Sequence, residues 1–328
     1  MVEGDCKMKA IGGYFELAER EAEFSIPVKG TLLNTARNAL EYILINLPFI
    51  KKVYLPYYTC EAVIEPLKRL NLSHQFYHIN QDFELLEDIF LLEGEYIIAN
   101  NYFGLKDTYI EMLFHHYGEK LIVDNAQALF APINSKMKAC FSTRKYVGVA
   151  DGGIATAVGN DLLSSLEYEQ TEEHNNHLYI RKELGAEAGF SHYQANECKL
   201  DNQPIRRMSQ STYDILHHID YNKVIEKRRA NYAYLEKALS LSNQLSLPAL
   251  DSFKCPMVYP YLNDGKINLR QTLISNKIFV ARYWPNVLEW ITNDSTEYHL
   301  ANHLLPLPID QRYDKIDMQK IIELILSY

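Results

Sequence analysis

The sequence has few cysteines, and none of them form a recognisable pattern. Its five cysteines are scattered along the chain and are never spaced as CxxC: Cys6, Cys60, Cys140, Cys198 and Cys255. A secreted disulfide framework would have an even, regular set, and a zinc site would have paired cysteines. We therefore expect neither a disulfide scaffold nor a metal site.

Long apolar runs are also missing. No apolar run approaches the length of about 20 residues that a membrane-spanning helix needs. The N-terminus carries Glu3 and Asp5 ahead of short apolar runs, whereas a signal peptide has a basic stretch followed by an apolar one. These absences predict a cytoplasmic protein that does not use a membrane as a partner.

A basic surface for nucleic acid is absent as well. The formal net charge is −9, and the largest compact basic cluster is Lys227-Arg228-Arg229. A protein that binds nucleic acid concentrates Lys and Arg on one face. We interpret the cluster as the solvated face of a helix and expect no nucleic-acid partner.

What the chain does contain is an alternation of helical and strand-like patterns from about residue 35. The segments with helical spacing are 38–47, 61–70, 109–117, 213–239 and 316–326, and the strand-like segments are 53–55, 75–79, 96–99, 120–123, 154–158, 257–262 and 279–283. Such alternation is typical of an α/β fold with a mostly parallel sheet. We predict a large domain over residues 1–220 and a small C-terminal α+β domain over residues 221–328.

Polar side chains gather where the predicted strands end or turn. Asn101, Asp124 and the segment 140–145 occupy such positions. In open parallel sheets, ligands bind outside the carboxyl ends of the strands. The sequence therefore predicts a site at this edge of the sheet.

Two residues at that edge carry specific chemistry. Asp124 directly follows the apolar strand, and a buried carboxylate there needs a cationic partner such as a protonated pyridine nitrogen. Lys145 follows small and hydroxyl residues and precedes Gly152-Gly153; partial burial and the neighbouring Arg144 would favour its neutral, nucleophilic amine. Alternatively, Asp124 only caps a turn and Lys145 is an exposed loop lysine.

Taken together, these segments resemble the DegT/StrS family of sugar aminotransferases. The shared pattern is Asp124-x-x-Gln127, then a hydroxyl-bearing loop with Lys145, then the Gly-Gly turn. Six further segments resemble family motifs in the same order along the chain: 56–59, 101–104, 207–209, the arginine pair 228–229, 282–285 and 304–309. The resemblance extends over most of the chain and implies the aspartate-aminotransferase fold, which is fold type I of the pyridoxal-phosphate enzymes.

The resemblance also implies roles for individual residues. Lys145 would hold pyridoxal 5'-phosphate through a Schiff base and move the proton at the substrate carbon. Asp124 would hold the proton on the pyridine nitrogen, which keeps the ring an electron sink. Gln127 would lie against the cofactor, and Asn101 stands where the family has a histidine. The cofactor phosphate would rest at the start of a helix near Ala36.

Several positions of the cofactor pocket depart from the family pattern. Ala36-Arg37 replaces a Gly-Thr pair, and Arg37 could bind the phosphate in a bidentate contact instead. Cys140 stands at the position of a serine, for which Ser142 could substitute. Cys60 stands at the position of the stacking aromatic residue, for which Tyr58 is the nearest replacement.

The function implied is the transfer of an amino group, with glutamate as donor, to a keto group of a nucleotide-linked sugar. Such a reaction serves the synthesis of surface polysaccharides or related sugars, and the family loop at 207–209 implies a homodimer. A pyridoxal-phosphate enzyme with another small substrate is one alternative, although family dehydratases carry histidine where this chain has Lys145. A non-catalytic member that binds a ligand or partner is the other.

Overall fold

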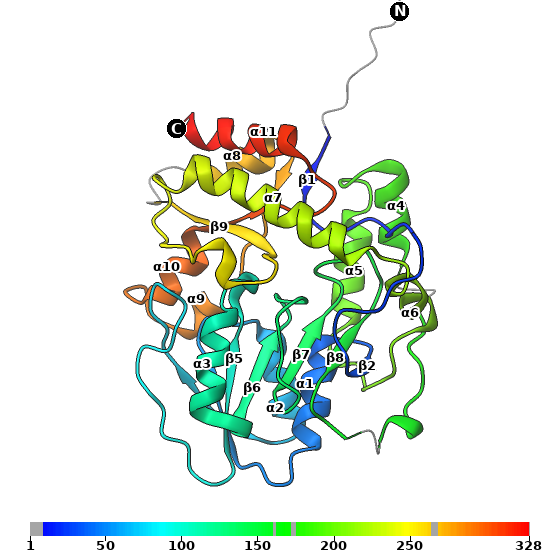
Figure 1. The fold of residues 1–328 in the computed structure, drawn as a ribbon, viewed down its shortest axis with the longest axis vertical. Coiled ribbons are helices and arrows are strands. Elements are labelled where there is room, and N and C mark those ends of the chain that lie inside the picture. The colour runs from blue at the N-terminus through cyan, green and yellow to red at the C-terminus, as the bar shows by residue number, and fades with distance from the viewer. Residues whose placement is uncertain (1–8, 160–161, 172–174, 264–267, 328) are drawn as a thin grey trace, which may run out of the picture.

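A seven-stranded, mostly parallel sheet forms the centre of the large part of the molecule (Figure 1). The structure is a computed structural model that describes residues 9–159, 162–171, 175–263 and 268–327. The strand order is β2-β8-β7-β6-β5-β3-β4, and β8 alone runs in the opposite direction, because it pairs antiparallel with both β2 and β7. The strands are β2 (Thr31–Leu33), β3 (Lys52–Pro56), β4 (Ser73–Tyr77), β5 (Glu95–Asn100), β6 (Leu121–Asn125), β7 (Lys138–Ser142) and β8 (Gly153–Ala155). The predicted α/β class with a mostly parallel sheet is confirmed.

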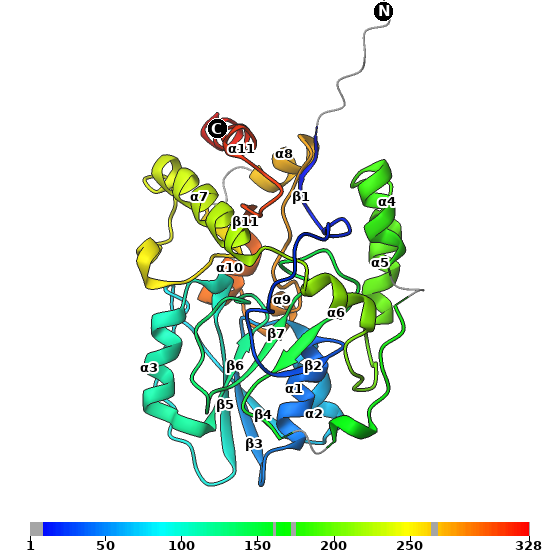
Figure 2. The same cartoon turned by 45° about the vertical axis from the view of Figure 1, so that its right-hand side comes forward.

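Both faces of this sheet are buried, which explains why its strands are almost continuously apolar. Successive side chains of a strand point to opposite faces, so Ile98 and Ile122 pack with helices α1 (Ala36–Ile45) and α2 (Ile64–Arg69). Ile97 and Leu121 pack on the opposite side, which α3 (Asp107–Tyr117) covers. Figure 2 shows α3 on one side of the sheet and α1 with α2 on the other.

The second part of the molecule lies beyond the carboxyl ends of the central strands. The long helix α7 (Tyr221–Leu239) begins after Asp220, whose side chain accepts hydrogen bonds from the backbone N–H groups of Asn222 and Lys223. The second part also contains two pairs of strands. Strand β9 (Val258–Leu262) pairs antiparallel with β11 (Leu304–Pro308), and β10 (Ile278–Phe279) pairs parallel with β1 (Ile11–Gly12). The N-terminal strand thus joins the C-terminal part. The domain boundary near residue 220 stays a prediction.

The remaining helices complete the two parts. The α-helices are α4 (Asn176–Leu184), α5 (Phe190–Lys199), α6 (Gln210–Leu216), α7 (Tyr221–Leu239), α8 (Leu269–Ser275), α9 (Val287–Trp290), α10 (Thr296–His303) and α11 (Lys315–Leu326). Short 3-10 helices are η1 (Glu61–Val63), η2 (Tyr102–Gly104), η3 (Gly118–Lys120), η4 (Leu163–Ser165) and η5 (Leu250–Ser252). Among the described residues, no helix combines the length and apolar character needed to cross a membrane.

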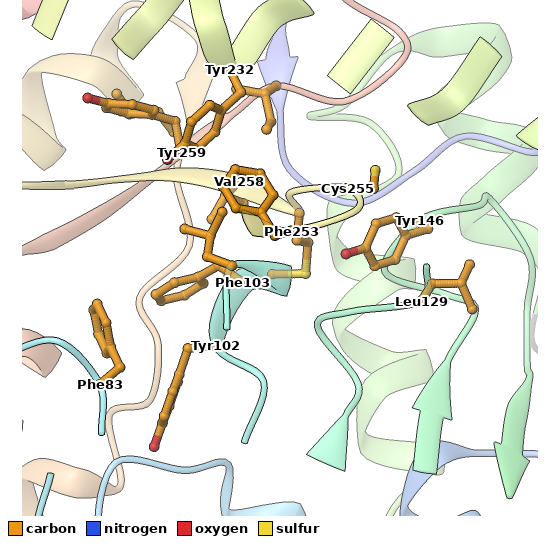
Figure 3. Packing of buried hydrophobic residues seen from close by; sticks show 14 of the residues in the cluster. Phe83, Tyr102, Phe103, Leu129, Tyr146, Tyr232, Phe253, Cys255, Val258 and Tyr259 are labelled. Carbon is orange, nitrogen blue, oxygen red and sulfur yellow. The ribbon is translucent and has the colours of Figure 1, made fainter. Parts of the chain in front are cut away.

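An aromatic cluster connects the two parts next to the strand ends (Figure 3). Phe103 of η2 packs there with Tyr232, Val258 and Tyr259, and its carbonyl accepts a hydrogen bond of 2.7 Å from the backbone N–H of Met257. Burial of such large apolar side chains is worth about 1.5–3 kcal/mol each. The cluster therefore fixes the second part over the edge of the sheet.

Two local predictions are wrong. The strand predicted over 279–283 ends at Phe279, and the residues that follow turn toward the strand ends. The basic cluster 227–229 is not a fully solvated helix face, because Arg228 points inward and is only 1% exposed. Helical periodicity places one residue of such a triplet on the buried side, and the packing of α7 selects Arg228.

Candidate active site

Three polar residues lie side by side at the carboxyl ends of three neighbouring strands. Asn100 of β5 is in register with Asp124 of β6, which is in register with Cys140 of β7. They share the sheet face that carries α1, because paired residues of neighbouring strands point the same way. A cavity of about 350 Å³ opens above them. Lys145 and Gln127 also line it, so the predicted site residues from distant segments do converge.

Asp124 has one occupied and one available carboxylate oxygen. Its Oδ1 accepts hydrogen bonds from the backbone N–H of Ala126 at 2.9 Å and from Cys140 Sγ at 3.8 Å. None of the described residues donates to Oδ2. Burial raises the pKa of Asp124, and the Ala126 N–H and the Lys145 charge oppose that rise. A cationic donor at Oδ2 would further stabilise the ionised form.

Lys145 reaches the cavity with its amine uncommitted. Its Nζ makes no hydrogen bond or salt bridge to any residue in the described ranges, whereas the neighbouring Arg144 is ion-paired with Glu197 of α5. The loop is held in place by Tyr146, whose hydroxyl donates to the carbonyl of Gln127 at 2.7 Å. The lysine is thus both positioned and free to react.

Gln127 presents an unused donor. Its Oε1 accepts a hydrogen bond from the backbone N–H of Phe103 at 3.1 Å, but its buried Nε2 has no partner among the described residues. A buried amide donor without an acceptor is costly, so a ligand oxygen is the expected partner. Asn101 lines the same cavity, but its side chain is already bonded to Asp107 and to the backbone N–H of Lys106.

The start of α1 forms the opposite end of the cavity. Thr35 caps the helix by accepting a hydrogen bond from the backbone N–H of Asn38, and the N–H groups of Ala36 and Arg37 have no intrahelical acceptor. Ser142 is buried and lines the cavity beside them. Gly153 packs so closely that a Cβ there would lie 2.1 Å from the carbonyl oxygen of Thr35. The Gly-Gly turn therefore lets β8 approach this helix start.

Arg37 lines the cavity, but acidic residues already engage it. Its guanidinium forms salt bridges with Glu65 at 2.5 Å and with Asp201 at 2.9 Å, and it donates to the carbonyl of Leu200. An incoming phosphate would have to compete with these partners. The role of Arg37 in phosphate binding stays a prediction.

The aromatic residue on the cavity wall is Trp284. Tyr58, proposed above as a replacement for the stacking residue, is fully buried outside the cavity and packs edge-on against Trp284 at 4.8 Å between ring centroids. Cys60 lines the cavity, and burial raises the pKa of its thiol. Trp284 was not predicted as a site residue. It lies in the segment 282–285, and the resemblance of this segment to a family motif is the feature of the sequence that could have indicated it.

Sequence reasoning missed the acidic residues of α5 and the turn after it. Glu197 and Asp201 line the cavity and pair with Arg144 and Arg37. The polar segment that contains them has no pattern that predicts such contacts. Within the described ranges, no group of three or more His, Cys, Asp or Glu residues is arranged to hold a metal ion.

This chain is similar to known proteins in its three-dimensional structure but not detectably in its sequence. No family model matches the sequence, and no curated protein matches it either. Solved structures do match. S. venezuelae DesV, solved with a ketimine intermediate, has a TM-score of 0.64 at 15% identity, covering 91% of this chain and 84% of that one.

Two other solved structures are similar to this chain to the same extent. DesI, crystallised in the presence of its TDP-sugar product, has a TM-score of 0.63 at 14% identity over 91% of this chain and 80% of its own. NtdA from Bacillus subtilis with bound cofactor PMP has a TM-score of 0.64 at 13% identity over 92% and 73%. This chain therefore has the aspartate-aminotransferase fold that the resemblance predicts.

Proposed function

We propose that this chain is a pyridoxal-phosphate-dependent aminotransferase. One observation carries the proposal: Lys145, Asp124, Gln127 and the start of α1 converge on a single cavity. These groups match the cofactor part by part, since it needs an amine for its aldehyde, an acid for its ring nitrogen and an anion site for its phosphate. The unpartnered Nε2 of Gln127 adds a donor suited to a cofactor oxygen.

Each residue has a distinct task in this proposal. Bound in the cavity, the cofactor supplies an electron sink for the negative charge that develops on the substrate carbon. Lys145 Nζ would hold the cofactor covalently and would then move the proton at the substrate carbon. Asp124 Oδ2 would accept the hydrogen bond of the ring nitrogen and would keep the proton on that nitrogen. Trp284 contributes its indole ring to the cavity wall.

The phosphate group would lie at the start of α1. The free N–H groups of Ala36 and Arg37 and the positive end of the helix dipole favour an anion there. The hydroxyl of Ser142 replaces the donor that is lost with Cys140, which is a poor hydrogen-bonding residue. Arg37 also contributes positive charge if its guanidinium releases Asp201 and binds the phosphate instead.

For the substrates, we propose glutamate as donor and a keto group of a nucleotide-linked sugar as acceptor, in the synthesis of surface polysaccharides or related sugars. The TDP-sugar product in the DesI structure and the ketimine in the DesV structure support this choice. We further propose a cytoplasmic homodimer, on the family resemblance of the segment 207–209.

A second candidate is a member of this fold that binds a ligand without catalysis. Two salt bridges favour this candidate, because Arg37 pairs with Asp201 and Arg144 pairs with Glu197. Both carboxylates line the cavity beside the proposed phosphate site, where they would repel an anion.

A single spectroscopic experiment separates the two candidates. Purified protein is incubated with pyridoxal phosphate, desalted and scanned in the visible range before and after addition of glutamate. The aminotransferase proposal expects a visible band that bleaches with glutamate and returns with 2-oxoglutarate. A stable band that glutamate leaves unchanged would favour the non-catalytic candidate, and no band at all would reject cofactor binding.

A further inference from the structure

A second cavity also borders Lys145 and is lined by aromatic rings. It measures about 680 Å³ and shares Lys145 and Arg144 with the first cavity. We call it the aromatic cavity because its walls include Tyr14, Phe15, Phe190, Tyr193, Phe279 and Tyr283. Tyr14 and Tyr193 stack with ring centroids 4.8 Å apart. Flat apolar walls beside a reactive amine are suited to an organic substrate.

Arg228 of α7 also lines the aromatic cavity, and its side chain is only 1% exposed. Its Nε donates to Gln311 Oε1 at 3.0 Å and its Nη1 to the carbonyl of Met257 at 2.8 Å. The guanidinium lies 4.5 Å from the ring centroid of Tyr146, the residue after Lys145. Its Nη2 is buried and has no hydrogen-bond partner among the described residues.

The charge of Arg228 is not compensated by a direct ion pair. No carboxylate of the described residues forms a salt bridge with it, and both of its acceptors are neutral. Asp310 lines the same cavity; burial raises its pKa, but the charges of Arg312 and Arg228 outweigh this and lower it, so Asp310 attracts Arg228. Its carboxylate is nevertheless bonded to Arg312, at 2.7 Å, and not to Arg228. A fully buried guanidinium normally has a hydrogen-bonded anion, because burial of an unpaired charge costs several kcal/mol.

Two other guanidinium groups point to the same ligand chemistry. Arg181 pairs with Glu16, and Arg144 pairs with Glu197, yet Arg181 Nη1 and Arg144 Nε are buried without partners among the described residues. Both residues line the aromatic cavity. Three unused guanidinium N–H donors around one cavity are the feature expected where an oxyanion binds.

We propose that the aromatic cavity binds an oxyanion of the substrate, a carboxylate or a phosphate, and that Arg228 Nη2 is its principal donor. This proposal deepens the proposed function and rests on it, since it makes the cavity the substrate side of Lys145. The anion fixes the orientation of the substrate while the aromatic walls hold its body. Arg228 is thus a specificity-determining residue that selects anionic substrates.

The first test measures anion binding by calorimetry in the purified protein after incubation with pyridoxal phosphate. The probes are 2-oxoglutarate for a carboxylate and pyrophosphate for a phosphate. Arg228→Gln should raise the dissociation constant of one probe by about tenfold or more, because a hydrogen bond to a charged group is lost. The matched control is Arg229→Gln in the same helix, whose guanidinium binds the carbonyls of Leu250 and Phe253 away from the cavity.

The second test guards against misfolding of the Arg228 variant. Ile274 of α8 lines the aromatic cavity and is 36% exposed, so a polar replacement is tolerated. Ile274→Glu places a repelling charge there, whereas Ile274→Gln has similar size and no charge. The glutamate variant should weaken binding of the same probe severalfold relative to the glutamine variant, and salt should reduce the difference.

The outcomes separate this proposal from the proposed function. Unchanged binding of both probes in folded Arg228→Gln and Ile274→Glu proteins would overturn the anion site, even if the visible cofactor band forms normally. A missing cofactor band together with Arg228-dependent anion binding would reject the proposed function and keep the anion site. Probe binding that depends on Arg37 rather than Arg228 would assign the anion to the start of α1 and overturn the proposal.

Discussion

Asp124 and Cys140 face each other across β6 and β7, with the thiol 3.8 Å from the carboxylate. Burial raises the pKa of both groups, and each is affected by the other. A thiol is a weak donor, so it stabilises the carboxylate less than a serine hydroxyl would. The carboxylate therefore depends on another cationic or N–H partner at its free oxygen, which is the position proposed for the ring nitrogen of the cofactor.

Replacement of Lys145 should remove the covalent link without loss of the fold. Lys145→Arg keeps a positive charge at a partly exposed loop position, so the thermal unfolding temperature should change little. Mass spectrometry after borohydride reduction should find the cofactor on Lys145 in the parent protein and no adduct in the variant. An adduct at a different lysine of the variant would show that Lys145 is not the attachment site.

Replacement of Asp124 should weaken both cofactor binding and turnover. Asp124→Asn keeps the size of the side chain but removes the negative charge that holds the ring proton, so the ring withdraws electrons less effectively. We expect turnover to fall by orders of magnitude and the dissociation constant of the cofactor to rise. Transamination at the parental rate in this variant would mean that Asp124 only stabilises the turn through Ala126.

Arg37 and Asp201 should affect cofactor binding in opposite directions. Arg37→Ala should raise the dissociation constant about tenfold or more, because a contact of 1.5–3 kcal/mol to a charged group is lost. Asp201→Asn should lower it by up to about fivefold, since the exposed salt bridge to Arg37 that competes with the phosphate is worth about 1 kcal/mol at most. Titration of each apo variant with pyridoxal phosphate measures both effects.

A control distinguishes phosphate binding from a structural role of Arg37. Glu65→Gln removes the other salt-bridge partner of Arg37 and leaves the guanidinium in place. If Arg37 is only structural, Arg37→Ala and Glu65→Gln should reduce stability alike and leave cofactor affinity unchanged. Sedimentation of the same samples would reveal whether Arg37 instead supports subunit association.

Asp151 should make the stability of the protein pH-dependent. Its carboxylate accepts hydrogen bonds from Ser209 and Thr212 at the start of α6, and burial raises its pKa from 3.8 to about 6. Because the folded pKa is the higher one, the folded state binds the proton more tightly than the unfolded state. The resulting stabilisation is complete below about pH 3.8 and is lost as the pH rises through about 6.

Urea unfolding of the parent and Asp151→Asn proteins checks this effect. The free energy of unfolding of the parent, relative to the variant, should decrease by roughly 1.5 kcal/mol from pH 5 to pH 7.5, since one pKa unit corresponds to 1.36 kcal/mol. The comparison cancels the titration of other groups. A difference that stays constant or grows with pH would show that the pKa of Asp151 is not raised.

Local patterns in the sequence predict five of the seven strands of the sheet and the edge where the site lies, but they do not reveal β2 or β7. The apolar strand that ends on Asp124 requires burial on both faces, and a parallel sheet then brings the carboxyl ends of its strands together. Asp124, Gln127 and Lys145 could be named in advance because the segments that contain them resemble motifs of the DegT/StrS family. Their convergence on one cavity follows from the topology.

The partners of the cationic residues were decided only by the tertiary structure. Arg37 meets Asp201, and Arg228 turns into the aromatic cavity instead of the solvent, because helices far apart in sequence pack against each other. A basic residue has the same helical propensity on either face, so its local sequence does not reveal its contacts. Trp284 reaches the cavity for the same reason: the second part of the molecule folds over the strand ends, and this packing depends on long-range contacts that no local pattern specifies.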